Sequence, residues 1–346
     1  MSLKVDANAA IGIGDADPAV YLVLRDELAI GVERRDADEN VGAAKRFGGF
    51  FIPERRFGRI AHAALLAARG VRRYLGPMST RKGRVLIIAG SDSGGGAGIQ
   101  ADIKTVTVLG GYAMTAITAV TVQNTLGVTD VYAIPPNIVR AQIEAVMGDI
   151  GADVWKLGML GSAEHVRAVL ESWQEIGKTT PVVLDPVMIA KGGAALLSED
   201  AIAVIRDELM PIAAIVTPNA PEAEALTGVE VRGLDGQIEA AEILVEQLGA
   251  WSALVKGGHI EGEIVRDVLL TREGYRVFES PRIDTRATHG TGCTLASAIA
   301  AHMALGVGLT DAVEKARAYL MEAIRHAPGL GQGHGPLGHN WPLKLA

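Results

Sequence analysis

The sequence predicts an α/β fold in which helices cover both faces of a mainly parallel sheet. Three observations support this class. Short apolar runs alternate with segments of helical period from Val85 onward, hydrophobic residues make up 49% of the 346 positions, and polar or glycine-rich motifs follow several apolar runs. Strand–helix alternation is typical of parallel sheets, because each crossover helix packs back on a face of the sheet. This length suits one large domain or two modest ones.

The first expected strand is the apolar run 85–89, and the helix expected at 97–109 has Ile99 and Ile103 on its apolar side. A helix at 136–150 begins with Pro136, whose missing N–H costs nothing in a first turn. The other expected strands are 116–122, 154–157, 182–184, 214–217 and 253–255. The other expected helices are 163–176, 198–209, 237–248, 292–305 and 310–326. A hairpin over 268–278 is expected to turn at Glu273-Gly274.

Residues 1–77 differ from the rest of the chain. They mix aspartate, arginine and glycine with little period, which is typical of a disordered or loosely attached extension. The Ala-rich stretch 60–68 is flanked by arginines and is compatible with one amphipathic helix. A targeting role is disfavoured, because transit peptides are poor in acidic residues and this extension is not. We expect a functional domain at 78–346, starting at Met78, and interpret 1–77 as an extension or an artefact of start-site choice.

Composition excludes several functional classes. A formal charge of −7 argues against a nucleic-acid binder that uses a basic face. No run of about 18 apolar residues occurs, so no membrane span is expected. Cys293 is the only cysteine, which rules out an intramolecular disulfide and suits a reducing compartment. We therefore expect a cytoplasmic protein that binds neither nucleic acid nor membrane.

Glycines crowd the end of the first strand, in Gly90-Ser91-Asp92-Ser93-Gly94-Gly95-Gly96-Ala97-Gly98. A dinucleotide fingerprint would need glycine where Ile99 stands, and a Walker A loop would need Gly-Lys-Ser/Thr before the helix. Both common phosphate motifs are therefore excluded. The glycines still let the backbone approach or cover a ligand, although a tight strand–helix turn also explains them. Asp102 lies one helical turn further on, within expected reach of a ligand.

A second motif, His289-Gly290-Thr291-Gly292-Cys293, opens an Ala-rich helix. The free N–H groups and the dipole of a helix N-terminus form an anion hole, which phosphoryl transfer requires. The same field is expected to lower the pKa of the Cys293 thiol, which makes Cys293 a candidate general base. The alternative interpretation is a small packing residue.

Polar residues follow three further strands. Asp185 is placed to hold Mg²⁺ through water, or to orient a water molecule. Asn219 is a candidate helix cap, and Glu222 suits either a Mg²⁺–phosphate site or the helix N-terminus. Lys256, which precedes two glycines, suits an ATP phosphate. Because the carboxyl ends of parallel strands share one edge, these motifs together predict a phosphate-handling enzyme.

Several motifs occur in an order that we associate with one enzyme family. They are 89–92 with 95–105, Gln123-Asn124-Thr125, Lys156-Leu157-Gly158-Met159-Leu160, Asp185-Pro186-Val187-Met188, Thr217-Pro218-Asn219, Lys256-Gly257-Gly258-His259 and 289–293. This pattern resembles bacterial hydroxymethylpyrimidine/phosphomethylpyrimidine kinases, of the ribokinase-like superfamily. The resemblance covers roughly three quarters of the chain, from about 85 to 335, and none of residues 1–77.

The resemblance implies a ribokinase-like three-layer sandwich and two steps that use ATP and Mg²⁺. The alcohol of 4-amino-5-hydroxymethyl-2-methylpyrimidine is phosphorylated first, and its monophosphate then becomes the diphosphate used for thiamine. The implied substrate-binding residues are Gln123, Gly90, Asp102, Met159 and Val187. The implied catalytic residues are Cys293, Gly290, Thr291, Gly292 and Lys256. The nucleotide would contact Asn219, Lys256, Gly257 and Thr288, and the metal Asp185 and Glu222. We also expect a homodimer.

Some residues qualify the resemblance. Cys293 stands where many sugar kinases of the superfamily carry aspartate, which favours the pyrimidine branch. Ser93 stands where the family often has proline, and we expect only a small change in loop stiffness. Met159 and Val187 also suit simple core packing. The segments 94–98 and 190–195 are candidate lids.

Three rival functions differ in how well they fit. A pyridoxal kinase is the nearest, because its substrate has a similar ring and hydroxymethyl group. A non-catalytic pyrimidine-binding protein is disfavoured, because it would not need the anion hole, Asp185 and Lys256 together. A nicotinamide-dependent oxidoreductase is disfavoured by the failed fingerprint.

Overall fold

The computed structural model describes residues 83–189, 193 and 197–343, together with four short strands before residue 53. The chain divides into two compact units, Met1–Gly70 and Val71–Ala346. In the first unit, β1 (Val20–Leu24) pairs with β2 (Leu28–Val32) and β3 (Lys45–Phe47) with β4 (Phe50–Ile52), both antiparallel. The amphipathic helix expected at 60–68 lies outside the described residues, as does the candidate lid at 190–195 except for Gly193.

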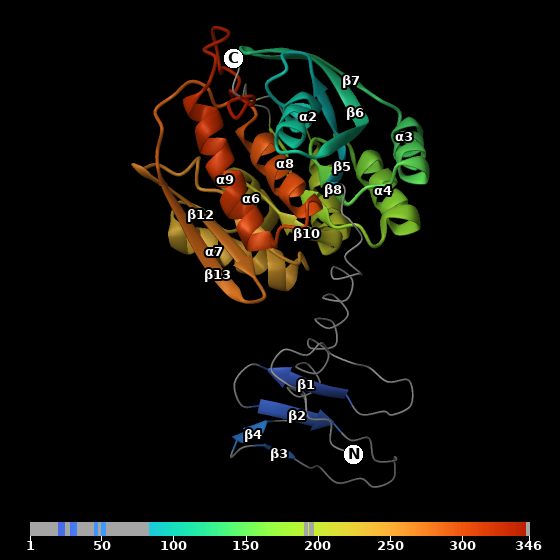
Figure 1. The fold of residues 1–346 in the computed structure, drawn as a ribbon, viewed down its shortest axis with the longest axis vertical. Coiled ribbons are helices and arrows are strands. Elements are labelled where there is room, and N and C mark those ends of the chain that lie inside the picture. The colour runs from blue at the N-terminus through green and yellow to red at the C-terminus, as the bar shows by residue number, and fades with distance from the viewer. Residues whose placement is uncertain are drawn as a thin grey trace. The chain divides into compact units, whose positions relative to one another are not determined.

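A nine-stranded sheet organises the described part of the second unit (Figure 1). Its order is β13-β12-β11-β10-β9-β8-β5-β6-β7, and the strands from β11 to β6 are parallel. Antiparallel pairing of β7 with β6 and of β12 with β11 and β13 completes both edges. The strands are β5 (Arg84–Asp92), β6 (Tyr112–Asn124), β7 (Gly127–Ala133), β8 (Val154–Leu157), β9 (Val182–Leu184), β10 (Ala213–Val216), β11 (Ala253–Val255), β12 (Ile264–Thr271) and β13 (Gly274–Pro281).

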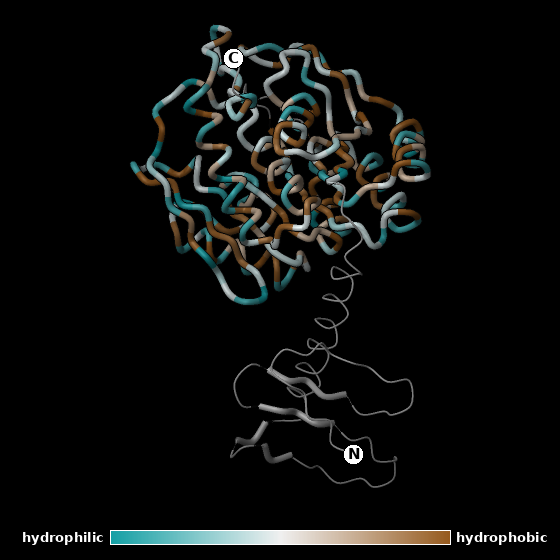
Figure 2. The backbone as a smooth tube through the Cα atoms, in the orientation of Figure 1, coloured by the Kyte–Doolittle hydropathy of each residue, from teal (hydrophilic) through white to brown (hydrophobic). Residues whose placement is uncertain are grey.

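Helices cover both faces of this sheet, as the sequence predicts. The helices are α2 (Gly98–Val108), α3 (Pro136–Asp149), α4 (Ala163–Ser172), α5 (Glu199–Val204), α6 (Ala220–Thr227), α7 (Leu234–Glu242), α8 (Thr291–Ala304) and α9 (Leu309–Arg325). Leu86 and Ile88 of β5 pack in the core shared with α3 to α7, whereas Val85 and Ile87 pack in the core shared with α2, α8 and α9. Alternate residues of a strand face opposite sides, so both faces of β5 are buried. Figure 2 shows hydrophobic positions throughout the central strands.

The expected elements agree with the structure within a few residues, and 154–157, 182–184 and 253–255 agree at both ends. Strand β7 was not expected, because most of its side chains are exposed and it lacks an apolar run. The helices expected at 163–176, 198–209 and 237–248 end in the π-helical turns Trp173–Gly177, Ile205–Leu209 and Ile243–Gln247. A 3-10 turn, Met210–Ile212, follows the second of these. The hairpin turn is Arg272-Glu273, one residue earlier than expected.

Sheet order determines where a ligand site can form. Strand β5 has β6 on one side and β8 on the other, so the strand order reverses at β5: β6 and β7 extend the sheet on one side, and β8 to β13 extend it on the other. In open α/β sheets the crevice beyond the carboxyl ends of the strands at such a point is the usual ligand site. Motifs after β5, β8, β9, β10 and β11 therefore lie at one edge of the sheet.

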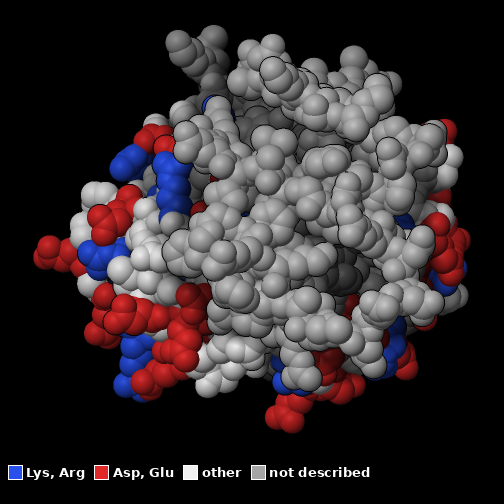
Figure 3. Space-filling view, turned by 90° about the horizontal axis from the view of Figure 1, so that it is seen from below, with Lys and Arg blue, Asp and Glu red and all other residues white. Residues whose placement is uncertain are grey.

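Two features of the described residues bear on the excluded classes, membrane-spanning proteins and nucleic-acid binders. Among the described residues, none of the helices is long and apolar enough to cross a membrane. On the described part of the face in Figure 3, acidic and basic side chains are interspersed around the rim.

Candidate functional site

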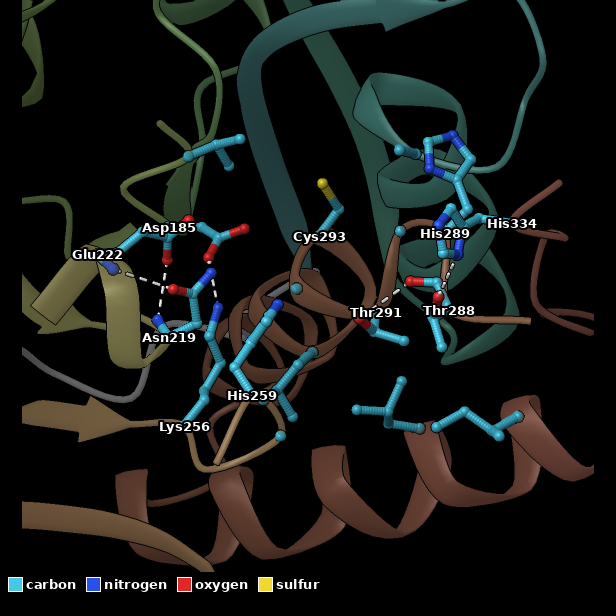
Figure 4. Close-up of a pocket in the computed structure, with 18 of the residues that line it drawn as sticks. Asp185, Asn219, Glu222, Lys256, His259, Thr288, His289, Thr291, Cys293 and His334 are labelled. Atoms are coloured by element: carbon cyan, nitrogen blue, oxygen red, sulfur yellow. Dashed lines mark hydrogen bonds and ion pairs between the residues drawn. The ribbon is translucent and has the colours of Figure 1, made fainter. Parts of the chain in front are cut away.

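A cavity of about 680 Å³ opens at the carboxyl edge of the sheet. It is lined by residues from the glycine-rich loop, the ends of the central strands and the first turn of α8 (Figure 4). The expected site residues that line it are Gly90, Gln123, Met159, Asp185, Val187, Asn219, Glu222, Lys256, Thr288, Gly290, Thr291, Gly292 and Cys293. Asp102 and Gly257 do not line it.

The first turn of α8 provides the anion hole. Gly290 is the N-cap residue, with φ of 82°, and a Cβ there would overlap the carbonyl oxygen of Gly96. Only glycine fits this left-handed, crowded position. A Cβ on Gly292 would lie 3.3 Å from Lys256 Nζ and 3.4 Å from the Oδ2 atom of Asp185. The free N–H groups of α8 therefore lie beside the Lys256 ammonium, whose charge is balanced in the ligand-free site by the Asp185 carboxylate.

Cys293 corrects one expectation. Burial is the main cause that raises the pKa of its thiol to about 12. Lys156 and a hydrogen bond with Gly98 oppose this shift, whereas the charges of Asp102 and Asp185 add to it. The expected lowering of the pKa is therefore wrong for the ligand-free site, where the net shift is upward because burial disfavours the charged thiolate. The thiol lines the cavity in its protonated form.

Alkylation of the single cysteine tests this state. Because the pKa of Cys293 is raised, its reaction rate with iodoacetamide should keep increasing about tenfold per pH unit up to at least about pH 10. A small-molecule thiol measured in parallel should level off once the pH passes its own pKa. Mass spectrometry of the ligand-free protein gives the rate, and a plateau near neutral pH would contradict the raised pKa.

Asp185, which is buried, and Lys256, which is partly exposed, form an ion pair at the ends of β9 and β11. Lys256 Nζ lies 2.9 Å from Oδ1 of Asp185, and the Thr217 hydroxyl donates to the same oxygen at 3.2 Å. The Oδ2 atom of Asp185 is buried and has no hydrogen-bond partner among the described residues. One carboxylate oxygen is therefore available to a ligand at the cavity.

Asn219 and Glu222 form a capping box at the start of α6. The Asn219 side chain accepts from the Glu222 N–H at 3.0 Å, and the Glu222 carboxylate accepts from the Asn219 N–H at 2.8 Å. The capping role expected for Asn219 is confirmed, and Glu222 serves the helix N-terminus. Burial raises the pKa of Glu222 to about 7, with Lys256 lowering it and the charge of Asp185 raising it. The Glu222 carboxylate is therefore close enough to interact electrostatically with Asp185 and Lys256 (Figure 4).

Asp92 orders the glycine-rich loop, a role that the sequence analysis did not assign. Its carboxylate accepts from the N–H groups of Gly94, Gly96 and Ala97 at 2.7–3.0 Å and lies 2.8 Å from Nε2 of His289. Burial opposes ionisation, but these hydrogen bonds outweigh it and lower the pKa of Asp92. An aspartate two residues before a run of glycines was the available signal, because such side chains accept from nearby backbone N–H groups.

Gln123 lies at the end of β6, next to this loop. Its side-chain oxygen accepts from the Thr121 hydroxyl at 3.0 Å, and its nitrogen lies 3.3 Å from His289 Nε2. The Ser93 hydroxyl donates to the Gln123 carbonyl at 2.8 Å and accepts from its N–H at 2.9 Å. Ser93 therefore does more than alter loop stiffness: it joins the loop to the backbone of Gln123.

Asp102 corrects a second expectation. It is fully buried, with Lys156 Nζ at 2.9 Å from one oxygen and the Ser297 hydroxyl at 2.7 Å from the other. Its carboxylate faces these partners instead of the cavity, and burial raises its pKa. Lys156, which was not expected as a site residue, lines the cavity in its place. Ser297 is one helical turn after Cys293 on α8, so Asp102 and Lys156 lie near the thiol, and their charges affect its pKa.

Gly257 corrects a third expectation. Its N–H donates to Asp267 at 2.8 Å, and a Cβ would overlap the carbonyl oxygen of Arg266. This glycine is therefore required by close strand packing and does not contact the cavity.

Comparison with known proteins gives a consistent result. Residues 92–338 match the phosphomethylpyrimidine kinase family. The hydroxymethylpyrimidine/phosphomethylpyrimidine kinase of Haemophilus influenzae is 46% identical over 260 residues, covering 74% of this chain and 96% of that protein. The thiamine biosynthesis bifunctional protein ThiED of Geobacter sulfurreducens is 49% identical over 258 residues, which are 75% of this chain but only 52% of that protein.

Two solved structures share the fold. The phosphomethylpyrimidine kinase from Clostridium difficile 630 is 41% identical, with a TM-score of 0.62, over 70% of this chain and 99% of that chain. An ADP complex of Bacillus subtilis pyridoxal kinase is 37% identical, with a TM-score of 0.70, over 75% and 98%. These likenesses confirm the expected ribokinase-like sandwich.

Proposed function

The chain belongs to the family of hydroxymethylpyrimidine/phosphomethylpyrimidine kinases of thiamine biosynthesis, and from that premise we propose a role for each part of its cavity. The activity is ATP-dependent phosphorylation of a small pyrimidine, first on its hydroxymethyl group and then on the resulting phosphate. One observation carries the division of roles: the anion hole and Cys293 open on the same cavity as Gln123 and as the Asp185–Lys256 pair.

The acceptor would lie beside Gly90, Gln123, Met159 and Val187. An amide offers a donor and an acceptor, which match the amino group and ring nitrogen of an aminopyrimidine. A Cβ on Gly90 would come within 3.1 Å of the Met159 sulfur, so the backbone and the thioether together form one wall. Asp102 is paired with Lys156 and Ser297 and would not contact the substrate.

The nucleotide phosphates would lie between Lys256 and the N–H groups of residues 290–293, with Asn219 and Thr288 at the borders of the site. Phosphoryl transfer needs positive charge and donors aimed at the moving phosphoryl group more than it needs a strong base. A protonated Cys293 can still accept a hydrogen bond from the attacking hydroxyl and orient it. The attacking hydroxyl would then lose its proton late in the transfer, which is compatible with the raised pKa of the thiol.

The residues present fit a Mg²⁺ ion. The free oxygen of Asp185 is buried, and Glu222 lies near enough for the charges to interact. Within the described residues no three His, Cys, Asp or Glu side chains form a metal cluster, so nucleotide oxygens and water would complete the coordination. Asp185 and Glu222 would hold the ion, which when bound neutralises phosphate charge.

Pyridoxal is a second candidate acceptor, because the TM-score to the Bacillus subtilis pyridoxal kinase, 0.70, exceeds that to the phosphomethylpyrimidine kinase, 0.62. The test is ADP release by the full chain with Mg-ATP and either hydroxymethylpyrimidine or pyridoxal. Two ADP per pyrimidine support the two-step kinase, and EDTA should abolish turnover. Turnover with pyridoxal alone would contradict the proposed acceptor.

Replacing Gln123 with alanine should raise KM for the pyrimidine by about tenfold or more, since one or two hydrogen bonds to the ring are lost. ATP hydrolysis without acceptor should stay near the wild-type rate. Steady-state kinetics with varied pyrimidine measure both. An unchanged KM would remove Gln123 from the substrate site.

Three features of the whole chain belong to the same proposal. We expect the 78–346 fragment to turn over at the wild-type rate, since every residue placed in the cavity lies within it. A homodimer is testable by sedimentation, and a cytoplasmic location by fractionation.

A further inference from the structure

The segment after α9, which we call the C-terminal strap (residues 331–341), contacts both halves of the cavity. It is the red end of the chain in Figure 1. We propose that this strap fixes the acceptor-binding turn (residues 123–126, at the end of β6) relative to the anion hole, with His334 as the positioning residue that joins them. The inference rests on the proposed function, because it concerns how accurately the acceptor meets the phosphoryl group.

On one side the strap is packed against Thr125, two residues after Gln123. The His334 N–H donates to the Thr125 carbonyl at 2.9 Å, and the Gly333 N–H donates to its hydroxyl at 3.4 Å. A Cβ on Gly331 or Gly333 would overlap Thr125. The strap therefore lies against this turn too closely for any side chain, and it constrains the backbone that carries Gln123.

On the other side the strap follows the segment that leads into α8. The Gly335 N–H donates to the Arg286 carbonyl at 3.1 Å, and the Gly335 carbonyl accepts from the His289 N–H at 3.2 Å. The imidazole of His334 lies at the cavity with Nδ1 3.1 Å from the Thr288 hydroxyl (Figure 4). His334 thus binds the acceptor turn through its backbone and the anion-hole segment through its side chain.

A second histidine anchors the strap. His339 is buried, and its Nε2 lies 2.9 Å from the hydroxyl of Thr294, in the first turn of α8 beside Cys293. The Tyr319 hydroxyl of α9 donates to the His339 carbonyl at 2.6 Å. Burial lowers the pKa of His339 to about 4, so this anchor is a neutral imidazole at physiological pH.

The strap should affect how accurately the acceptor hydroxyl is placed against the phosphoryl group more than it affects substrate affinity. A displacement of about 1 Å between reacting groups can cost about 100-fold in rate. A loosened site also admits water, which competes with the acceptor for the phosphoryl group. Loss of the His334 contact should therefore increase ATP hydrolysis relative to pyrimidine phosphorylation.

The experiment measures ADP and phosphorylated pyrimidine in the same reaction, with the full chain. For His334→Ala we expect kcat to fall about tenfold or more, the ratio of ADP to transferred phosphate to rise above one, and KM for ATP to change less than about twofold. His334→Asn should retain coupling, because the asparagine oxygen replaces Nδ1 as a partner for Thr288. The matched control is Gln332→Ala, an exposed strap residue, which should behave as wild type.

Tyr319→Phe is the second variant, because it removes one anchor hydrogen bond while keeping the ring, and it should raise the same ratio by a smaller factor. Wild-type coupling in both His334→Ala and Tyr319→Phe, with only a lower Tm, would overturn the inference. A kinetic loss that His334→Asn does not restore would also overturn it, since His334 would then act on the substrate directly. A wild-type chain that phosphorylates no pyrimidine would instead overturn the proposed function on which the inference rests.

Discussion

Replacing Gly290 with alanine should lower kcat by about 10²–10³-fold, the size of effect found when a donor to a transition-state oxyanion is lost. The φ of 82° and the contact with the Gly96 carbonyl leave no room for a Cβ. The first turn of α8 must therefore shift, and its N–H groups no longer point at the transferred phosphoryl group. Single-turnover kinetics with bound ATP separate this loss from any change in nucleotide affinity.

Gly308→Ala is a matched control for this change. Gly308 is the N-cap residue of the neighbouring helix α9, but its φ is −62° and no atom lies within 4 Å of an added Cβ. This variant should keep wild-type kcat. If Gly290→Ala also stayed within about tenfold of wild type, the N–H groups of α8 would not be the main stabilising donors.

Replacing Lys156 with methionine should lower the free energy of unfolding by about 3–5 kcal/mol, the usual cost of removing one partner from a fully buried ion pair. Asp102 would keep only Ser297 as a partner and would be left as a buried charge or be forced to bind a proton. Urea denaturation monitored by circular dichroism gives the change.

Two variants show whether the pair is responsible. Lys156→Met combined with Asp102→Leu should regain much of the stability, because no unpaired charge remains. Arg167→Met removes an exposed cation paired with Glu208 and should leave the denaturation midpoint unchanged. A Lys156→Met protein as stable as wild type would show that the interior accommodates Asp102 without the lysine.

The fold could be predicted from the sequence because its signals are local. Both faces of the central strands are buried, so β8, β9 and β11 stand out as apolar runs with clear ends. Strand β7 could not be found this way, because it is an exposed edge strand that is specified by pairing with β6. The π-helical ends of α4, α5 and α7 leave no signal that differs from ordinary helical periodicity.

The candidate site was predictable where a residue type suits its place on a strand or helix. The residues at the ends of β9, β10 and β11 and in the first turn of α8 do meet at one cavity. Asp102 and Lys156 could not be assigned correctly, because which of two opposite charges faces a cavity depends on packing between α2, β8 and α8. The state of Cys293 was mistaken for a similar reason: the sequence locates the helix N-terminus but not the desolvation of the half-buried thiol or the carboxylates of Asp102 and Asp185 near it.

The raised pKa of Cys293 also affects how fast the protein is oxidised by peroxides. Peroxides attack the thiolate far faster than the thiol, and this attack oxidises the cysteine to sulfenic acid. A thiol with a pKa of about 12 is almost entirely protonated at neutral pH, so it should resist peroxide longer than an ordinary exposed cysteine. Because the chain has no second cysteine, an oxidised Cys293 could not be protected as an intramolecular disulfide. The slow reaction of the protonated thiol therefore protects Cys293 against irreversible oxidation to sulfinic or sulfonic acid.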